Sequence, residues 1–156
     1  MYSEDNLKNV TFYYGNQSKT LSCQSGNNKN CTTNLDLSSY DGQYLDYWFV
    51  VSDYVRNVSS KSTRIKVDTS IPMLSVNSPL NVDYARRVPF NISVSEKTKL
   101  EYYDNSALRP RWKSLCSNCN KYTSKKSFSI GNHDIIIRAT DKAGNSAEVS
   151  RNFLVA

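Results

Sequence analysis

The residues best suited to chemistry in this sequence are its four cysteines, which fall in two local pairs, Cys23 with Cys31 and Cys116 with Cys119. An even number of cysteines in short polar segments favours disulfides, which form in oxidising compartments. The Cys116-x-x-Cys119 spacing also occurs in redox motifs, but those need a helix N-terminus to lower the thiol pKa, and the flanks here show no helical period. Zinc is a further alternative, for which the spacing of the first pair is poor. We therefore predict the disulfides Cys23–Cys31 and Cys116–Cys119.

Catalytic chemistry has little support in the rest of the sequence. His133 is the only histidine, which removes most schemes that rely on a base at neutral pH. The sequence has no nucleophile elbow, no phosphate-binding glycine loop and no histidine-bearing metal motif. Nothing marks a carboxylate pair for glycoside hydrolysis. We predict that the protein is not an enzyme and that it uses no cofactor.

Calcium is the metal to test, because aspartates recur near the predicted turns. The sequence contains no EF-hand loop and no acidic linker of the kind that binds calcium between modules. We therefore predict no metal site, and we assign a turn-capping role to the aspartates Asp41, Asp46, Asp53, Asp134 and Asp141.

Two tryptophans are the candidate ligand contacts, with glycans as the ligand class. Tyr47, Phe49 and Val51 share one phase of a period-two pattern and are predicted to be core, which leaves Trp48 pointing outward. Trp112 lies in a basic segment, Arg109-Pro-Arg-Trp-Lys113. Trp48 and Trp112 are therefore the aromatic side chains that we select.

The net charge of +6 comes entirely from residues 69–156, which hold 13 basic and seven acidic side chains. Basic residues beside aromatic ones suit nucleic acid, anionic glycans or acidic membrane surfaces. No recognition helix, zinc finger or RRM-type motif accompanies them. We favour a solvated loop and predict no nucleic-acid partner.

Five N-x-S/T sequons are present, a weak excess over the roughly three or four expected by chance from this composition. They fall in predicted loops or on the outward phase of a strand. The candidate glycosylation sites are Asn9, Asn16, Asn30, Asn57 and Asn91.

Strands must position these residues, because the composition disfavours helices. The 156 residues include 17 Asn, 23 Ser and 11 Tyr, while Leu, Ala and Glu are scarce. No apolar run approaches the roughly 20 residues of a membrane-spanning helix, and the first residues lack the pattern of a signal peptide. We expect no helical bundle and no membrane insertion in this segment.

The two halves of the sequence repeat each other. Residues 10–16 align with residues 99–105, and residues 31–67 match the second half at a constant offset of 88. This offset pairs Cys31 with Cys119 and Asp53 with Asp141. The sequence therefore predicts a duplicated module, each copy with its own disulfide.

Each copy consists of short alternating strands. Val88, Phe90, Ile92 and Val94 alternate with polar residues, as expected of a half-buried strand. Residues 141–145, Asp-Lys-Ala-Gly-Asn, form a turn signal between two further alternating runs. Such a pattern is typical of an antiparallel β-sandwich.

Residues 135–145 together with Phe153-Leu-Val155 resemble the last hairpin of bacterial and archaeal immunoglobulin-like or fibronectin-III-like surface repeats. The linker at residues 67–72, followed by Ser78-Pro79, resembles the joins in such arrays. The resemblance implies an all-β chain of two tandem immunoglobulin-like antiparallel β-sandwich modules, at residues 1–68 and 69–156.

The resemblance also implies a function, a non-enzymatic structural or adhesive segment of an extracellular cell-surface protein, stalk, sheath or filament. The implied partners are neighbouring copies or other surface proteins. A carbohydrate-binding module that contacts glycans is the alternative.

The copies differ in one respect. Residues 71–98 precede the Tyr-Tyr strand of the second copy, whereas only about nine residues precede that strand in the first. We therefore predict that the first module lacks its N-terminal strands. Either a longer chain contains them, or a neighbouring chain completes a filament subunit by strand donation, or the first sheet is reduced.

Overall fold

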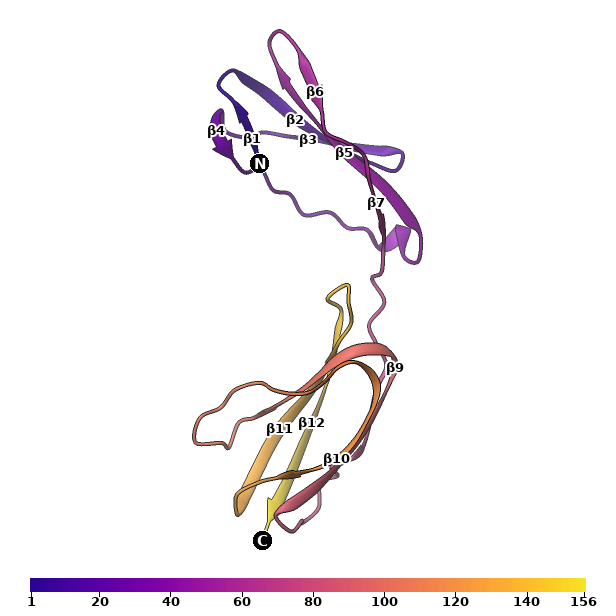
Figure 1. Cartoon of the computed structure of the whole chain (residues 1–156), viewed down its shortest axis with the longest axis vertical. Helices are drawn as coiled ribbons and strands as arrows, with labels where there is room; N and C mark the ends of the chain where they lie inside the picture. The colour runs from indigo at the N-terminus through magenta and orange to yellow at the C-terminus, as the bar shows by residue number, and fades with distance from the viewer. The chain divides into compact units, whose positions relative to one another are not determined.

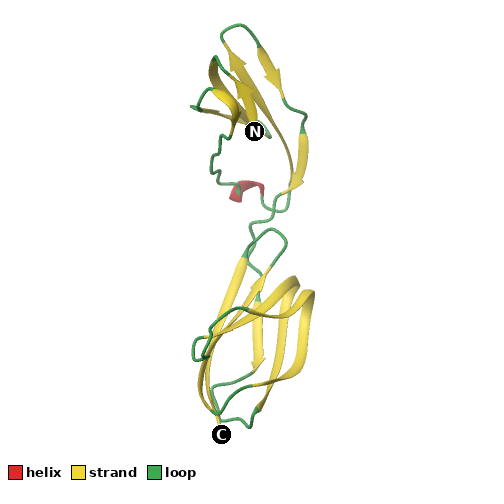
Figure 2. Cartoon of the chain, turned by 60° about the vertical axis from the view of Figure 1, so that its left-hand side comes forward, coloured by secondary structure: helices red, strands yellow, loops and turns green.

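The computed structural model describes all 156 residues, which divide into two compact units, Met1–Thr69 (unit 1) and Ser70–Ala156 (unit 2). Strands and one short 3-10 helix make up the regular structure (Figure 1, Figure 2). None of it is a helix that is long and apolar enough to cross a lipid bilayer. The predicted all-β class is confirmed.

Unit 2 is a two-layered sandwich in which two long strands take part in both layers. Its strands are β8 (Leu74–Ser78), β9 (Arg87–Asp104), β10 (Lys113–Ser127), β11 (Gly131–Thr140) and β12 (Ser146–Val155). β9 and β10 curve strongly (Figure 1). One layer joins β8, the first part of β9 and the last part of β10. The other joins the first part of β10, the second part of β9, β11 and β12.

Alternating apolar residues from both layers form the core of unit 2. The first part of β9 contributes Val88, Phe90 and Ile92, all of which are at most 1% exposed. From the other layer, Tyr102 contacts Phe90, with 5.5 Å between ring centroids, and Ile137 is fully buried. A strand alternates between core and solvent, so the phase of each strand also fixes which side chains point outward.

Unit 1 contains one five-stranded sheet. Its strands are β1 (Tyr2–Glu4), β2 (Leu7–Tyr14), β3 (Gln17–Leu21), β4 (Gly26–Lys29), β5 (Tyr44–Asp53), β6 (Asn57–Ser59) and β7 (Thr63–Lys66), and the helix η1 spans Ser38–Tyr40. The sheet has the order β3-β2-β5-β6, with β7 also paired to β5, while β1 and β4 form a separate ribbon.

The sheet of unit 1 corresponds to the second layer of unit 2, and the strand register corrects one part of the sequence alignment. Phe12 pairs with Phe49, and Tyr102 pairs with Ile137, which is the counterpart of Phe49 at the offset of 88. Phe12 is therefore the counterpart of Tyr102. The alignment of residues 10–16 with residues 99–105 is wrong by one residue, because it matched the Tyr-Tyr doublets rather than the phase of the strand pairing.

Unit 1 has no counterpart of β8, in line with the sequence prediction, and only the short β1 stands in the place of the first part of β9, because its pairing with β4 continues the β2–β3 ladder. Residues 30–37 correspond to part of β10 at the offset of 88, but they form no strand, and Figure 2 draws them as a loop leading to η1. The layer that β8, the first part of β9 and the last part of β10 form in unit 2 is therefore reduced in unit 1 to the short β1–β4 ribbon.

Candidate functional site

Trp112 belongs to an aromatic patch on the outer face of unit 2. Tyr102 is in the core, so the next residue, Tyr103, points to the opposite face of the sheet. The rings of Tyr103 and Trp112 lie 5.4 Å apart, and the guanidinium carbon of Arg138 lies 3.7 Å from the centre of the Trp112 ring. We call Tyr103, Trp112 and Arg138 the outer patch of unit 2.

Carboxylates offset the positive charge of this patch. Arg138 donates a hydrogen bond of 3.3 Å to Glu101, and its guanidinium lies 3.8 Å from Glu148. Lys99 contacts the second oxygen of Glu101 at 2.6 Å. The Lys99 hydrogen bond, opposed by desolvation and supported by Arg138, lowers the pKa of Glu101. The rings of Tyr103 and Trp112 are tilted by 54° to each other, and Arg138 covers one face of Trp112. Because the Arg138 and Lys99 charges are paired with carboxylates, the patch suits contact with an uncharged ring better than capture of an anion.

Trp48 lies in a similar patch on unit 1. It points away from Phe49 and Val51, as predicted, and its ring stacks on Tyr13 with centroids 5.1 Å apart and planes within 2°. Tyr13 is the counterpart of Tyr103 in the corrected register. Both tryptophans therefore stand on the outer faces of equivalent sheets, each beside the equivalent tyrosine. The sequence prediction missed both tyrosines, although the period-two phase of each strand contained the signal.

His133 is a core residue. Its side chain is 4% exposed, and its ring lies 4.9 Å from that of Phe128. Nδ1 lies 2.8 Å from the carboxylate of Asp104, and Nε2 lies 3.0 Å from the Ser129 carbonyl oxygen and 3.4 Å from its hydroxyl. A carbonyl oxygen can only accept, so Nε2 carries a hydrogen and cannot serve as the base for Ser129. Ser129, His133 and Asp104 are the residue types of a catalytic triad, but here their hydrogen bonds stabilise a turn.

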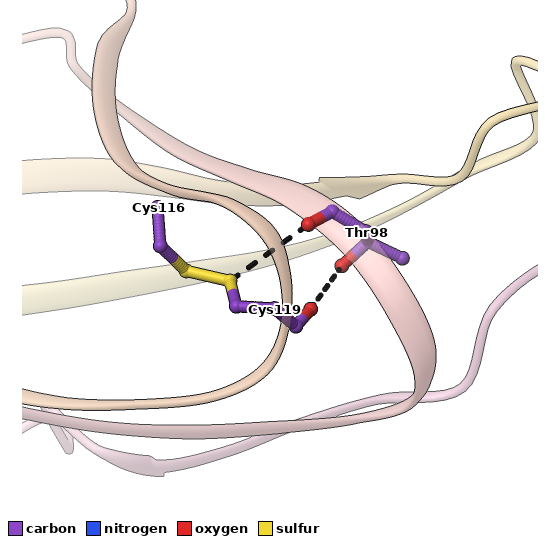
Figure 3. Close-up of a disulfide and its surroundings, with 3 residues drawn as sticks. All are labelled: Thr98, Cys116 and Cys119. Atoms are coloured by element: carbon purple, nitrogen blue, oxygen red, sulfur yellow. Dashed lines mark hydrogen bonds between the residues drawn. A yellow bond between two sulfur atoms is a disulfide. The ribbon is translucent and has the colours of Figure 1, made fainter.

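Both cysteine pairs are joined as disulfides. Cys23 and Cys31 have Cα atoms 5.7 Å apart, and Cys116 and Cys119 have Cα atoms 6.2 Å apart. The second bridge spans an irregular part of β10, where Thr98 of β9 donates a hydrogen bond of 3.4 Å to the Cys119 carbonyl (Figure 3). Both long strands pass between the layers in this region. The disulfide therefore fixes a corner of the sandwich and offers no free thiol for redox chemistry or zinc.

Two of the predicted turn-capping aspartates occupy equivalent hairpins. Asp53 accepts hydrogen bonds from the backbone N–H groups of Arg56 and Val55, which lower its pKa. Asp141 accepts from Gly144 and Asn145 at 2.7 and 2.9 Å. Desolvation raises the pKa of Asp141, but the hydrogen bond from the Asn145 side chain at 2.9 Å, together with these backbone bonds, outweighs it and the net shift is downward. The local turn geometry accounts for both aspartates.

The Asp141 turn should make unit 2 sensitive to acid. A carboxylate with a folded-state pKa below its usual 3.8 stabilises the fold above that value, and the contribution is lost as the pH falls through the folded-state pKa. We expect Asp141→Asn to lower the free energy of unfolding at pH 6 and to flatten its decline between pH 5 and pH 2. Urea denaturation across this range measures both effects. The exposed Asp83→Asn is the control, and an unchanged acid limb in Asp141→Asn would contradict the assignment.

The turn-capping role predicted for Asp46 and Asp134 is wrong, because both lie within strands, β5 and β11. Asp46 forms a bidentate pair with Arg64 at 2.8 and 2.9 Å, and Asp134 accepts from the Asn105 side chain at 2.9 Å. Asp41 accepts from the Thr69 N–H at 2.7 Å.

Four of the five sequon asparagines are exposed and Asn9 is half-buried, so the exposed set comprises Asn16, Asn30, Asn57 and Asn91.

No described protein family and no curated protein matches this sequence. Among solved structures, the chain is similar to the fibronectin(III)-like modules of CbhA from Clostridium thermocellum, with a TM-score of 0.56 and 13% identity, over 99% of this chain and 81% of that one. The fold is fibronectin(III)-like. At this identity the likeness concerns the fold alone. The predicted resemblance is thus confirmed for the fold, while a relation to bacterial or archaeal surface repeats stays a prediction.

Proposed function

We propose that this chain is a non-enzymatic structural or adhesive segment of an extracellular cell-surface protein. The observation that carries the proposal is the duplication. Each of the two units contains an equivalent sheet, an aspartate-capped hairpin and a local disulfide, and these features lie at corresponding places in the two copies. Repetition of a disulfide-bearing β-sandwich suits a protein that spans distance or presents surfaces outside the cell. Its partners are neighbouring copies of itself or other surface proteins.

Carbohydrate binding is the second candidate, favoured by the two equivalent outer patches. Trp112 with Tyr103, and Trp48 with Tyr13, offer ring surfaces on the same face of two equivalent sheets. The balanced charges around Arg138 favour neutral sugars over acidic ones. Exposed sequons on both units also fit an extracellular glycoprotein.

A glycan array with the intact chain separates these two functions. If the outer patches bind sugars, Trp112→Ala or Trp48→Ala should reduce binding by at least about tenfold, since loss of a stacked ring removes most of a small site. Leu108→Ala, which alters a fully exposed loop residue, is the control and should leave binding unchanged. No binding to any glycan by the folded protein would support the structural role and reject the carbohydrate-binding one.

A further inference from the structure

One layer of unit 2 contains positive charges and no negative ones. This layer joins β8 with residues 87–95 of β9 and residues 121–127 of β10, and we call it the basic layer. Its charged residues are Arg87, Lys121, Lys125 and Lys126, and it includes no aspartate and no glutamate. The other layer holds carboxylates as well as cations. Charge in unit 2 is therefore segregated between the two layers.

Three of the four cations point away from the core. The core residues of β9 have even numbers, so Arg87 and the other odd-numbered positions face outward. In β10, Lys125 pairs with Pro89 and Lys121 pairs with Ser93, and directly paired residues of an antiparallel ladder share a face. Arg87, Lys121 and Lys125 are all exposed. We call these three residues the cation row.

The cation row has no carboxylate partner. The ion pairs of unit 2 involve the cations Lys99, His133 and Arg138, none of which belongs to the basic layer. Lys126, the fourth cation of the layer, lies on the opposite face of β10, where its Nζ is 5.5 Å from the centre of the Tyr122 ring. The row therefore presents three charges to solvent that no acidic side chain neutralises.

The row is long and narrow. Ser127 pairs with Arg87, so the three cations lie along β10 at the positions of residues 127, 125 and 121. At about 3.4 Å per residue, these positions extend over about 20 Å. A linear chain of negative charges can contact all three cations at once, whereas one small anion reaches only part of the row.

Small polar side chains surround the row. The outward positions next to it are Ser75, Asn91, Ser93, Thr123 and Ser127. Their hydroxyl and amide groups donate and accept hydrogen bonds, which suits the hydroxyl groups of a sugar. No aromatic side chain faces outward in this layer, whereas protein interfaces rely on aromatic anchors and single-stranded nucleic acids bind by stacking. The face therefore suits a polysaccharide better than either of these.

The free edge of β10 is less suited to binding than its outer face. β10 pairs with β9 alone, so one edge of it is open. Lys126 points inward on this edge strand, because it pairs with the core residue Val88. An inward-pointing charge opposes the addition of another strand. The side chains of the outer face, rather than the backbone of the edge, are therefore the groups available to a ligand.

We propose that the cation row of unit 2 binds a linear anionic polysaccharide, one that carries carboxylate or sulfate groups along its length. The cations form charge-assisted hydrogen bonds with these groups, and the surrounding hydroxyl and amide side chains contact the sugar hydroxyls. This inference names a ligand for the adhesive role proposed above and rests on it. A negative result would reject the polysaccharide ligand and leave the structural role in place.

The test measures binding of the full chain to fluorescein-labelled alginate, which carries carboxylates, and to labelled dextran sulfate. The chain is produced in a bacterial host, so that no N-glycan covers Asn91 on this face. We expect saturable binding to at least one of them, and none to neutral dextran. The affinity should fall at least about tenfold between about 50 and 250 mM NaCl, because binding releases counterions. Lys121→Gln combined with Lys125→Gln should weaken binding at least about tenfold, and Lys125→Gln alone about threefold or more.

Adjacent lysines on opposite faces of β10 provide the matched control. Lys126→Gln removes the same charge as Lys125→Gln but from the inner face, and Lys142→Gln removes it from an exposed turn. Each control should change the affinity by less than about twofold. The proposal is overturned if neither anionic polysaccharide binds, or if either control weakens binding as much as Lys125→Gln. Equal, row-dependent binding of polyglutamate or duplex DNA would also overturn it, as would binding that is lost in Trp112→Ala and kept in Lys125→Gln.

Discussion

Asp104→Ala should reduce the free energy of unfolding of unit 2 by about 3–5 kcal/mol, because it leaves a buried polar ring without its partner. Asp104 and His133 are each 4% exposed and lie 2.8 Å apart. The Asp104 carboxylate also accepts a hydrogen bond from the Ser106 N–H at 3.0 Å. A loss of this size is a large part of the roughly 5–15 kcal/mol that stabilises a typical domain.

Fluorescence can follow unit 2 alone, since each unit holds one tryptophan. In a Trp48→Phe background, urea denaturation monitored at Trp112 reports the unfolding of unit 2. The exposed Asp83→Ala should cost less than about 0.5 kcal/mol. Replacing both partners, with Asp104→Leu and His133→Leu, should recover part of the loss, because no unpaired polar group then remains in the core. A loss in Asp104→Ala no larger than in Asp83→Ala would contradict the role assigned to the pair.

Much of the fold could be predicted from the sequence because local patterns determine it. The alternation of Val88, Phe90 and Ile92 predicts a strand with one buried face, and burial bears this out. The repeated Asp53 and Asp141 turns predict two hairpins at corresponding places, and both form. In each hairpin the aspartate accepts backbone N–H groups of its own turn, although the Asp53 turn is one residue shorter than the Asp141 turn. These features depend on neighbours in the sequence, so a single sequence contains them.

Features that depend on contacts between distant residues were harder to predict. The one-residue error in aligning Tyr13 with Tyr102 arose because similar residue types can occupy opposite faces, and only pairing with the adjacent strand shows which face each takes. The placement of Arg138 on Trp112 depends on two segments that are far apart in the sequence. The His133–Asp104 pair is likewise non-local, so the sequence identified the histidine but not its partner.

We expect Phe49→Ala in unit 1 to reduce the free energy of unfolding less than Ile137→Ala at the equivalent position of unit 2, although the larger side chain usually costs more to truncate. Ile137→Ala should destabilise unit 2 by about 2–5 kcal/mol, because Ile137 is fully buried between two layers. Phe49→Ala removes a larger side chain, which in a closed core costs about 3–5 kcal/mol. In unit 1 we expect less than about 2 kcal/mol, because Phe49 is only half-buried in the folded unit.

Phe49 and Ile137 occupy the same place in equivalent sheets, so the difference between the two losses of stability reflects the layer that covers each residue. Unfolding of unit 1 is followed at Trp48 in a Trp112→Phe background, and that of unit 2 at Trp112 in a Trp48→Phe background. Truncating accessible apolar surface forfeits little transfer free energy and creates no cavity, whereas truncating a residue between two layers does both. A cost for Phe49→Ala that equals or exceeds that of Ile137→Ala would mean that Phe49 lies in a closed core in solution.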